Sequence, residues 1–262
     1  MKIAIHGAAG RMGQRVTALA HADSRFTVVA ALESADHPAL GKDAGLVAGI
    51  GEIGVPLGVV GEWNADVVID FSVPDAAIAV VAHCVEYKRP VVVATTGLDT
   101  EQQQYLQRAA KQIPIVWSPN MSTAVNLAMK LTRVAGEALR TLPTGVDVEI
   151  IESHHRYKED APSGTALKFG QILSDAMNLT QHTHGRSGRP GARPRNEIGY
   201  HAIRAGDDPG QHTILFGMLG ESIELRVAAT NRDCYAQGAL LAAQWLVGKP
   251  VGLYNMNDVL GL

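Results

Sequence analysis

Residues 2–13 read Lys-Ile-Ala-Ile-His-Gly-Ala-Ala-Gly-Arg-Met-Gly, and this stretch decides the first part of the fold. A short apolar run leads directly into a glycine-rich turn, and apolar residues then recur at helical spacing. Glycines let the chain turn tightly, and the start of a helix presents N–H groups without intrahelical partners. The stretch therefore predicts a strand over Lys2–His6 and a helix over Gly10–Ala20, the opening of a nucleotide-binding sheet.

The first half of the chain repeats this alternation of strand and helix. Further strands are predicted at Phe26–Leu32, Ala65–Phe71, Pro90–Ala94 and Ile113–Trp117, and further helices at Asp75–Glu86 and Thr100–Gln112. Nearly continuous apolar strands that alternate with helices are typical of a parallel sheet covered on both faces. We therefore expect an α/β fold with a Rossmann-like, doubly wound parallel sheet in this half.

The pattern changes near residues 118–123. Helices are predicted at Thr123–Leu139, Ser163–Met177 and Tyr235–Val247, a strand at Asp147–Ser153, a long loop at His182–Asn196, and three antiparallel strands at Gly199–Ala205, Gln211–Leu219 and Glu221–Ala229. Runs of strands here, against regular alternation earlier, indicate a second domain. We expect it to be an α+β domain with a mainly antiparallel open sheet.

Composition excludes several classes of protein. The chain has 262 residues, 46% of them hydrophobic and 19% charged, so it can bury a sizeable core. No apolar stretch approaches the roughly 20 residues of a membrane span, and the first residues lack the layout of a signal peptide. Two cysteines without a Cys-x-x-Cys pair favour a reduced, cytoplasmic protein.

The basic loop at 182–196 raises the question of nucleic-acid binding. Its arginines are Arg186, Arg189, Arg193 and Arg195. No aromatic residue lies between them, and the formal net charge of the chain is -3. We therefore expect no nucleic-acid partner, and interpret the segment as an ordered loop that braces the site or a neighbouring subunit.

The glycine turn and a later acid together indicate a dinucleotide. Glu33 follows the second predicted strand about twenty residues after Gly13, where an acid accepts hydrogen bonds from ribose hydroxyls. The turn departs from Gly-x-Gly-x-x-Gly because Ala8 takes the first glycine position. A structural glycine turn beside a surface glutamate is the alternative. Ser34 follows the acid and is not a cation, but Arg11 could supply one, so both NADH and NADPH stay open.

The chemical signal is the run at residues 152–166, Glu-Ser-His-His-Arg-Tyr-Lys-Glu-Asp-Ala-Pro-Ser-Gly-Thr-Ala. His154 and His155 reach the end of a predicted strand and point in different directions, so they can serve different parts of a ligand. Imidazole and the amine of Lys158 can each deliver a proton. The segment Pro162–Thr165 predicts a helix start that can hold a carboxylate. Together these residues fit a small dicarboxylate, whereas a solvated loop with a helix cap is the alternative.

A metal site is not expected in this run. Adjacent histidines are poorly spaced for binding one zinc ion, and no cysteine lies nearby. His182 and His184 lie in the predicted loop without further candidate ligands near them.

The sequence resembles the dihydrodipicolinate reductase family over nearly its whole length. The resemblance rests on Gly-x-x-Gly-Arg-Met-Gly, on the run at 152–166 and on Arg-Ala-Gly-Asp at 204–207. It implies reduction of 4-hydroxy-tetrahydrodipicolinate to tetrahydrodipicolinate with NADH or NADPH in lysine and diaminopimelate biosynthesis, by a homotetramer whose second domains pair through their sheets. It also implies a dinucleotide-binding domain at 1–121 and 233–262 and a substrate-binding and oligomerisation domain at 122–232.

The resemblance also implies roles for individual residues. His154 and Lys158 match the proton donors, and His155, Ser163, Gly164 and Thr165 match substrate contacts. Cofactor contacts are Gly7, Ala8, Ala9, Gly10, Arg11, Met12, Glu33, Ala94, Thr95, Thr96, Ser118, Pro119, Asn120 and Met121. Ser34 stands where arginine is frequent, so a preference for NADPH is in question. The rival hypotheses are another NAD(P)-dependent dehydrogenase of a small amino or hydroxy acid and a non-enzymatic NAD(P) sensor.

Overall fold

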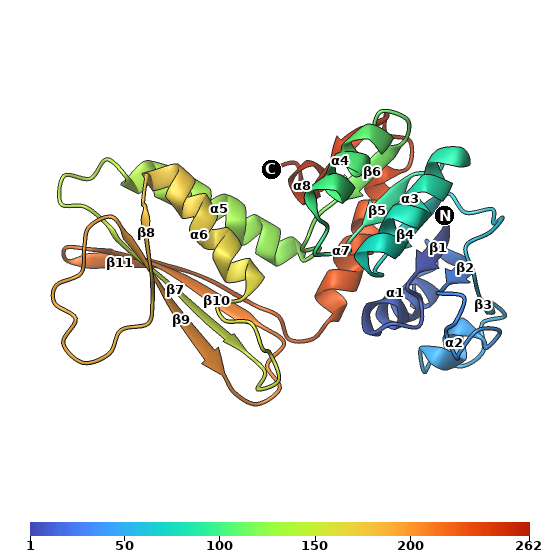
Figure 1. The fold of residues 1–262 in the computed structure, drawn as a ribbon, viewed down its shortest axis with the longest axis horizontal. Helices are drawn as coiled ribbons and strands as arrows, with labels where there is room; N and C mark the ends of the chain where they lie inside the picture. Colours follow the sequence, from blue (N-terminus) through green and yellow to red (C-terminus); the bar gives the residue numbers. More distant parts are fainter. The chain divides into compact units, whose positions relative to one another are not determined.

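The computed structural model describes residues 1–262, and the chain divides into two units (Figure 1). Unit 1 comprises Met1–Thr123 and Arg232–Leu262, and unit 2 comprises Ala124–Asn231. Unit 2 is therefore an insertion within the sequence of unit 1.

Unit 1 is built on a seven-stranded sheet in the order β12-β6-β5-β4-β1-β2-β3. The strands are β1 (Lys2–His6), β2 (Thr27–Leu32), β3 (Leu57–Gly58), β4 (Val67–Asp70), β5 (Val91–Val93), β6 (Pro114–Trp117) and β12 (Gly252–Tyr254). Every pairing in the sheet is parallel, and the strand order reverses direction at β1. The predicted doubly wound parallel sheet is confirmed. The two edge strands, β3 and β12, were not predicted because two or three residues carry no readable pattern.

Helices cover both faces of this sheet. They are α1 (Arg11–Ala22), α2 (Ala44–Val47), α3 (Pro74–Glu86), α4 (Thr100–Ala109), α7 (Asp233–Leu246) and α8 (Met256–Leu260). Side chains alternate along β1, so Ile3 and Ile5 pack in one core with α7, while Ala4 packs in a second core on the opposite face. Both cores are fully buried at these positions, as expected for a parallel sheet between helices.

Unit 2 contains a five-stranded sheet in the order β11-β10-β7-β9-β8. Its elements are α5 (Thr123–Leu139), β7 (Asp147–His154), α6 (Gly164–Met177), β8 (Gln181–His184), β9 (Glu197–Arg204), β10 (Gln211–Met218) and β11 (Glu221–Ala228). The α+β class is confirmed, but the sheet is mixed: β10 pairs antiparallel with β7 and β11, whereas β9 pairs parallel with β7 and β8. An alternating pattern identifies a strand without identifying its neighbour, which is why β9 was expected beside β10.

The start of the predicted loop at 182–196 forms part of a strand instead. β8 includes His182 and His184 and pairs parallel with β9, so the irregular segment begins at Gly185. Short polar strands at a sheet edge lack the apolar alternation that identifies a strand in sequence.

One face of the unit 2 sheet packs against α5 and α6, which lie side by side in Figure 1. Val148, Ile150 and Phe216 point into this core together with Phe169 of α6. The opposite face carries the intervening residues, such as Ile151 and Leu215, which are partly exposed. None of the helices in either unit has the length and apolar character needed to cross a lipid bilayer.

Candidate active site

The predicted cofactor residues of unit 1 gather at one edge of its sheet. Gly7 follows β1, Glu33 follows β2, Thr95 lies just beyond β5 and Ser118 follows β6. Because all these strands are parallel, their carboxyl ends meet at the same edge, beside the point where the strand order reverses. This is where open α/β sheets bind their ligands.

The turn after β1 requires glycine at two positions. Gly7 has a φ of 73°, and a Cβ there would lie 2.5 Å from the carbonyl oxygen of Phe71. A Cβ at Gly13 would collide with the carbonyl oxygen of Gly7. Gly10 begins α1 without a side-chain cap, so the first N–H groups of the helix face the turn. A backbone concavity with free donors fits a pyrophosphate, although Ala8 breaks the usual spacing.

Glu33 lies against this turn. The N–H of Ala9 donates to Oε2 of Glu33 at 3.0 Å, and the N–H of Ser34 donates to Oε1 at 3.1 Å. The carboxylate is thus fixed beside the glycine turn and retains acceptor capacity for ribose hydroxyls. Arg11 is exposed and forms no ion pair. The sequence and the geometry are therefore compatible with either nicotinamide cofactor.

A buried carboxylate that was not predicted ties three strand ends together. Asp70, at the end of β4, is fully buried, and Nδ1 of His6 lies 2.7 Å from its Oδ1. The hydroxyls of Ser72 and Thr95 donate to Asp70 at 2.6 Å each. The carboxylate thereby joins the ends of β1, β4 and β5 and fixes Thr95, a predicted cofactor contact. Only the sheet order reveals this cluster, because its residues are far apart in sequence.

The second predicted cofactor loop, Ser118–Met121, is also held internally. The hydroxyl of Ser118 donates to the carbonyl of Asn120 at 2.8 Å, and the N–H of Ser122 donates to Oδ1 of Asn120 at 2.9 Å. Met121 is almost completely buried, at 1% exposure, whereas Pro119 is exposed. Hydrogen bonds and burial therefore hold both ends of the loop, and Pro119 in its middle faces solvent.

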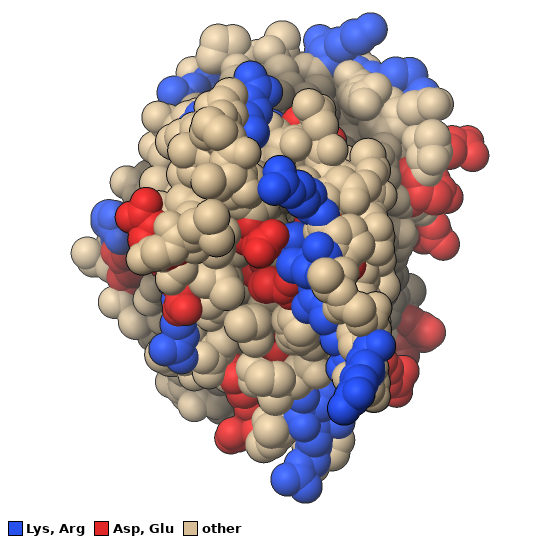
Figure 2. Space-filling view, turned by 90° about the vertical axis from the view of Figure 1, so that its left-hand side faces the viewer, with Lys and Arg blue, Asp and Glu red and all other residues tan.

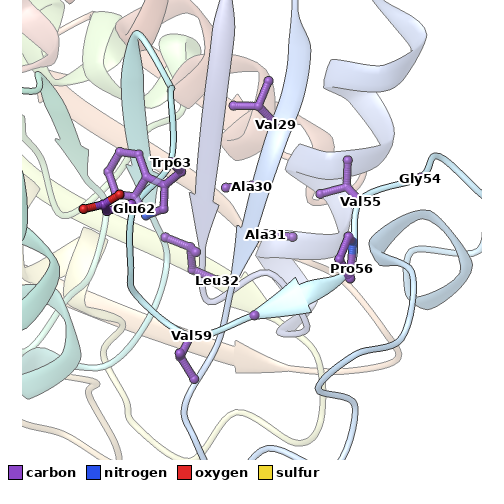
Figure 3. Close-up of a pocket in the computed structure, with 11 residues that line it drawn as sticks. Val29, Ala30, Ala31, Leu32, Gly54, Val55, Pro56, Val59, Glu62 and Trp63 are labelled. Carbon is purple, nitrogen blue, oxygen red and sulfur yellow. The ribbon is translucent and has the colours of Figure 1, made fainter.

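A cavity of about 220 Å³ lies along the edge of β2 in unit 1 (Figure 3). It is lined by Val29, Ala30, Ala31, Leu32, Gly54, Val55, Pro56, Gly58, Val59, Glu62 and Trp63. None of the predicted site residues lines it, and Glu62 is its one ionisable lining group. The cavity adjoins Glu33 without being lined by it, since the lining residue Gly58 accepts the N–H of Glu33 at 2.8 Å.

In unit 2, β7 delivers the predicted catalytic run to the end of a central strand. His154 is the last residue of β7 and is 9% exposed. His155 follows it, donates its backbone N–H to the carbonyl of Asp208 at 2.8 Å, and has a buried Nδ1 without a partner. The backbone N–H of Lys158 donates to the carbonyl of His155, and its Nζ donates to Asp160 at 2.7 Å. Two imidazoles and an amine thus lie within one short turn.

The start of α6 uses the predicted Ser163 as its cap. Oγ of Ser163 accepts the N–H of Ala166 at 3.1 Å and lies 2.9 Å from Nε2 of His212. Ser163 is 3% exposed, so its hydroxyl is engaged inside the protein. Gly164 has open space where a side chain would be, which leaves the first turn of α6 accessible at that point.

Glu152 and Arg204 belong to the site and were missed. Oε2 of Glu152 lies 2.5 Å from Nδ1 of His154, and Oε1 accepts the backbone N–H of Ser163 at 3.1 Å. Arg204 donates from Nη1 and Nη2 to the two carboxylate oxygens at 2.8 and 2.7 Å. Two-residue alternation along β7 could have placed Glu152 on the same face as His154. Arg204 could be placed in the site only once the register of β9 was known, because that register pairs it with His154.

The electrostatics of this cluster favour a carboxylate next to a neutral imidazole. Burial acts to raise the pKa of Glu152, but hydrogen bonds from Arg204 and His154 outweigh it and hold the pKa below its ordinary value. Burial lowers the pKa of His154, against the opposing effect of Glu152. Both directions together describe an acceptor that stays ionised and a ring that is uncharged near neutral pH.

His212 is a third buried histidine beside this cluster. It is 5% exposed, and its ring meets that of His154 edge-on with 5.2 Å between centroids. Burial lowers the pKa of His212 to about 4, and neighbouring His154 acts in the same direction. His212 is therefore an uncharged hydrogen-bonding partner for Ser163.

The basic loop of unit 2 is anchored by ion pairs. Arg186 donates to Glu149 at 2.8 Å and also pairs with the buried Glu197. Arg193 donates to Glu149 at 3.0 Å and to the backbone carbonyl of Val148 at 2.9 Å. Figure 2 shows Lys and Arg side chains lying beside Asp and Glu side chains on this face. The anchored arginines are thus matched by carboxylates.

The fold and the site define a class of protein. A doubly wound sheet with a glycine turn and an acid fixed beside it suits a nicotinamide dinucleotide, and the histidine and lysine turn of unit 2 carries groups that can supply protons. These are the properties of an NAD(P)-dependent oxidoreductase.

Comparison with known proteins identifies the family. Residues 1–121 match the family described as dihydrodipicolinate reductase, N-terminus, and residues 124–260 match dihydrodipicolinate reductase, C-terminus. The chain belongs to the dihydrodipicolinate reductase family. The predictions of this family and of an NAD(P)H-dependent oxidoreductase are confirmed.

Individual relatives and structures agree with this assignment. A 4-hydroxy-tetrahydrodipicolinate reductase of Rhodopirellula baltica is 54% identical over 100% of this chain and 96% of its own length. One from Alkalilimnicola ehrlichii is 47% identical over 100% and 99%. A dipicolinate-bound dihydrodipicolinate reductase structure from Paenisporosarcina sp. TG-14 has a TM-score of 0.77 and 25% identity over 98% of both chains. An amine dehydrogenase of Mycobacterium smegmatis, at 12% identity and a TM-score of 0.61, shares the fold alone.

Proposed function

We propose that this chain reduces 4-hydroxy-tetrahydrodipicolinate to tetrahydrodipicolinate, with NADH or NADPH as the hydride donor, in lysine and diaminopimelate biosynthesis. The observation that carries the proposal is the turn at the end of β7, which carries two imidazoles and a lysine amine. His154, His155 and Lys158 lie together there, in the same unit as the start of α6. The names of the full-length relatives support the choice of substrate.

The substrate is a ring with two carboxylates, and unit 2 supplies groups that suit both. Lys158 provides an ammonium, His155 provides a ring nitrogen that has no protein partner, and Gly164 and Thr165 belong to the first turn of α6. A helix start stabilises an anion through its N–H groups and its dipole. Ser163 contributes by capping the helix, since its hydroxyl is already bonded.

Reduction of the ring adds a hydride and a proton. When bound, the nicotinamide supplies the hydride. His154 and Lys158 stabilise or protonate the negative charge that develops on the nitrogen side of the ring, because placed cationic and acidic groups lower the energy of that charge. Both side chains are partly shielded from water, which strengthens their electrostatic effect.

Unit 1 holds the cofactor in this proposal. The turn from Gly7 to Met12 binds the pyrophosphate, and Glu33 accepts hydrogen bonds from the adenosine ribose. The loops Ala94–Thr96 and Ser118–Met121 border the nicotinamide. The positions of these segments at the carboxyl ends of parallel strands support the assignment.

We propose further that the enzyme is a cytoplasmic homotetramer. The uncovered face of the unit 2 sheet, with Ile151 and Leu215 partly exposed, supports pairing with the same face of a second copy. Neither Cys84 nor Cys234 forms a disulfide, in keeping with a reducing compartment. Light scattering after size exclusion should give the mass of four chains, and Leu215→Arg should reduce it. A monomeric wild-type chain would exclude this assembly.

The activity is tested by following nicotinamide absorbance with substrate made in situ from pyruvate and aspartate semialdehyde. The wild-type chain should oxidise the cofactor only when substrate is present. His154→Gln and Lys158→Ala should each lower turnover by about 10²- to 10⁴-fold. Lys168→Ala, a surface lysine on α6, is the matched control and should leave turnover unchanged. If adding substrate causes no oxidation of the cofactor by the wild type, a sensor is favoured. Oxidation of an amino or hydroxy acid instead would favour a different dehydrogenase.

A further inference from the structure

Glu152 is the buried acid nearest to the proposed proton donor. It is 1% exposed, and both of its oxygens are used: Oε2 lies 2.5 Å from Nδ1 of His154, and each oxygen also receives one N–H of Arg204. The backbone N–H of Ser163 completes the set. A surface acid would have water as a competing partner, but this one is surrounded by donors from three separate segments.

The charge state of Glu152 decides which nitrogen of His154 carries a hydrogen. An ionised carboxylate can only accept hydrogen bonds, so Nδ1 of His154 must be the donor. A neutral imidazole has one N–H, and Nε2 is then left with its lone pair. The same contact fixes the rotation of the ring, because it is short and the carboxylate is itself held on two sides.

Arg204 prevents the proton from leaving the ring toward Glu152. Its guanidinium forms a bidentate hydrogen bond with the carboxylate of Glu152, which favours the ionised form of that carboxylate. Arg204 is the last residue of β9 and pairs in register with His154, so the cation is supplied by a neighbouring strand and not by a loop.

Gly210 packs closely against Nε2 of His154. A Cβ at residue 210 would lie 2.8 Å from Nε2 of His154, but residue 210 is glycine. Gly210 is in an unusual conformation, with φ of 141°, which other residues rarely adopt. A side chain at residue 210 would therefore strike the nitrogen that Glu152 leaves unbonded, and glycine avoids this clash.

We propose that Glu152, held by Arg204, is a positioning residue that locks neutral His154 in the Nδ1–H form, so that Nε2 is the atom that takes up a proton from water and passes it to the ring being reduced. The proposal rests on the catalytic role proposed for His154 above. It adds a reason why the acid two residues before the histidine belongs to the machinery of the reaction.

The first test needs only the wild-type protein without substrate. NMR of ring-labelled histidine, with the signals of His154 identified by their loss in His154→Gln, distinguishes the two neutral forms. We expect the hydrogen on Nδ1. A ring with its hydrogen on Nε2 would overturn the proposal, whatever the enzyme turns out to reduce.

The second test is kinetic. Glu152→Gln keeps an acceptor oxygen but loses the charge, so the Nε2–H form should become populated and kcat should fall by about 10²- to 10⁴-fold with KM nearly unchanged. The alkaline limb of the pH profile, where the ring loses the proton that it delivers, should move to lower pH, because the group that favours the protonated ring is gone. Glu152→Asp should recover part of kcat.

Glu149→Gln is the matched control. Glu149 lies on the same strand and pairs with arginines, but its side chain is on the other face of the sheet, so kcat and the pH profile should stay at wild-type values. A folded Glu152→Gln with an unmoved pH profile and an unchanged histidine form would overturn the proposal. An inactive wild type with the hydrogen on Nδ1 would instead contradict the substrate assignment.

Discussion

Each unit of the molecule buries a carboxylate against a histidine, and the two pairs differ in what else surrounds the acid. Asp70 in unit 1 bonds to His6 at 2.7 Å, and Glu152 in unit 2 bonds to His154 at 2.5 Å. The remaining partners of Asp70 are hydroxyls, whereas Glu152 also binds the guanidinium of Arg204.

This difference separates a structural acid from one that controls charge. Hydroxyls can donate or accept, so the Asp70 cluster can rearrange when its charge changes. A guanidinium only donates, so Arg204 demands an anion. The first cluster joins the ends of three strands. The second sets the protonation of His154, the last residue of β7. The role of a buried carboxylate–histidine pair can therefore be assigned only when the third partner of the carboxylate is known.

The largest expected effect concerns the acid of unit 1. Asp70→Ala leaves the buried imidazole of His6 and the buried hydroxyl of Thr95 without their acceptor and should lower the free energy of unfolding by about 4 kcal/mol. Asp70→Asn should cost only about 1 kcal/mol, because the hydroxyls can turn to accept the new N–H. The tryptophans Trp63, Trp117 and Trp245 all lie in unit 1, so their fluorescence in denaturant reports this unit. Equal losses for both variants would mean that the charge of Asp70 matters as it does for Glu152.

The next effect is the pH dependence of unit 2. The folded pKa of His212 is about 4 against an ordinary value of 6.5, so the unfolded chain binds the proton more readily. Stability contributed by neutral His212 is complete above pH 6.5 and falls as the pH drops toward 4, by about 3 kcal/mol in total. Amide exchange in β10 measures it. His212→Gln keeps a polar group near Ser163 but does not titrate, so a loss of the same size in this variant would contradict the assignment.

A smaller effect is expected on the open face of the sheet, where carboxylates and arginines form a third kind of cluster. Arg193→Ala removes contacts to Glu149 and to the backbone of Val148 and should destabilise unit 2 by about 2 kcal/mol. Arg189→Ala and Arg195→Ala, in the same loop but without partners, should change stability by less than about 0.5 kcal/mol. Limited proteolysis of the loop checks the order. Equal sensitivity of all three variants would show that the ion pairs do not anchor it.

The smallest effect tests the cap of α6. Ser163→Ala removes an acceptor for the N–H of Ala166 and should cost about 1 kcal/mol. Ser163→Asp restores an acceptor but places a second acid beside Glu152, so it should rescue the helix less well than Ser163→Thr. Thermal unfolding followed by circular dichroism compares the three. A better result for Asp than for Thr would argue against a strongly anionic environment at Glu152.

Much of unit 1 could be predicted because its strands are apolar throughout and its turn residues are distinctive. Gly7 and Gly13 were informative for a steric reason, since a side chain at either would strike neighbouring backbone. Glu33 was predicted from its distance from the turn, and it lies against that turn in the structure. Strands as short as β3 and β12 could not be found, because they owe their form to a neighbour in the sheet and not to their own pattern.

Unit 2 was harder because its chemistry depends on which strands are neighbours. The run from His154 to Thr165 was visible as a cluster of functional groups in one stretch of sequence. Arg204 and His212 come close to Glu152 only through the register of β9 and β10 on either side of β7. Alternation shows which residues share a face, but no local signal states that β7 lies between two strands that follow it.

The insertion of unit 2 also governs the order in which the protein can be made. Helix α7 supplies Ala236, Ala239 and Leu240 to the same core as Ile3 and Ile5, yet it follows all of unit 2 in the chain. During synthesis, a nascent chain that has emerged as far as Asn231 contains every residue of unit 2. It still lacks α7, the helix that covers one face of the sheet in unit 1. The sheet that starts at the N-terminus must therefore wait on the ribosome, with an apolar face uncovered, until its last helix arrives.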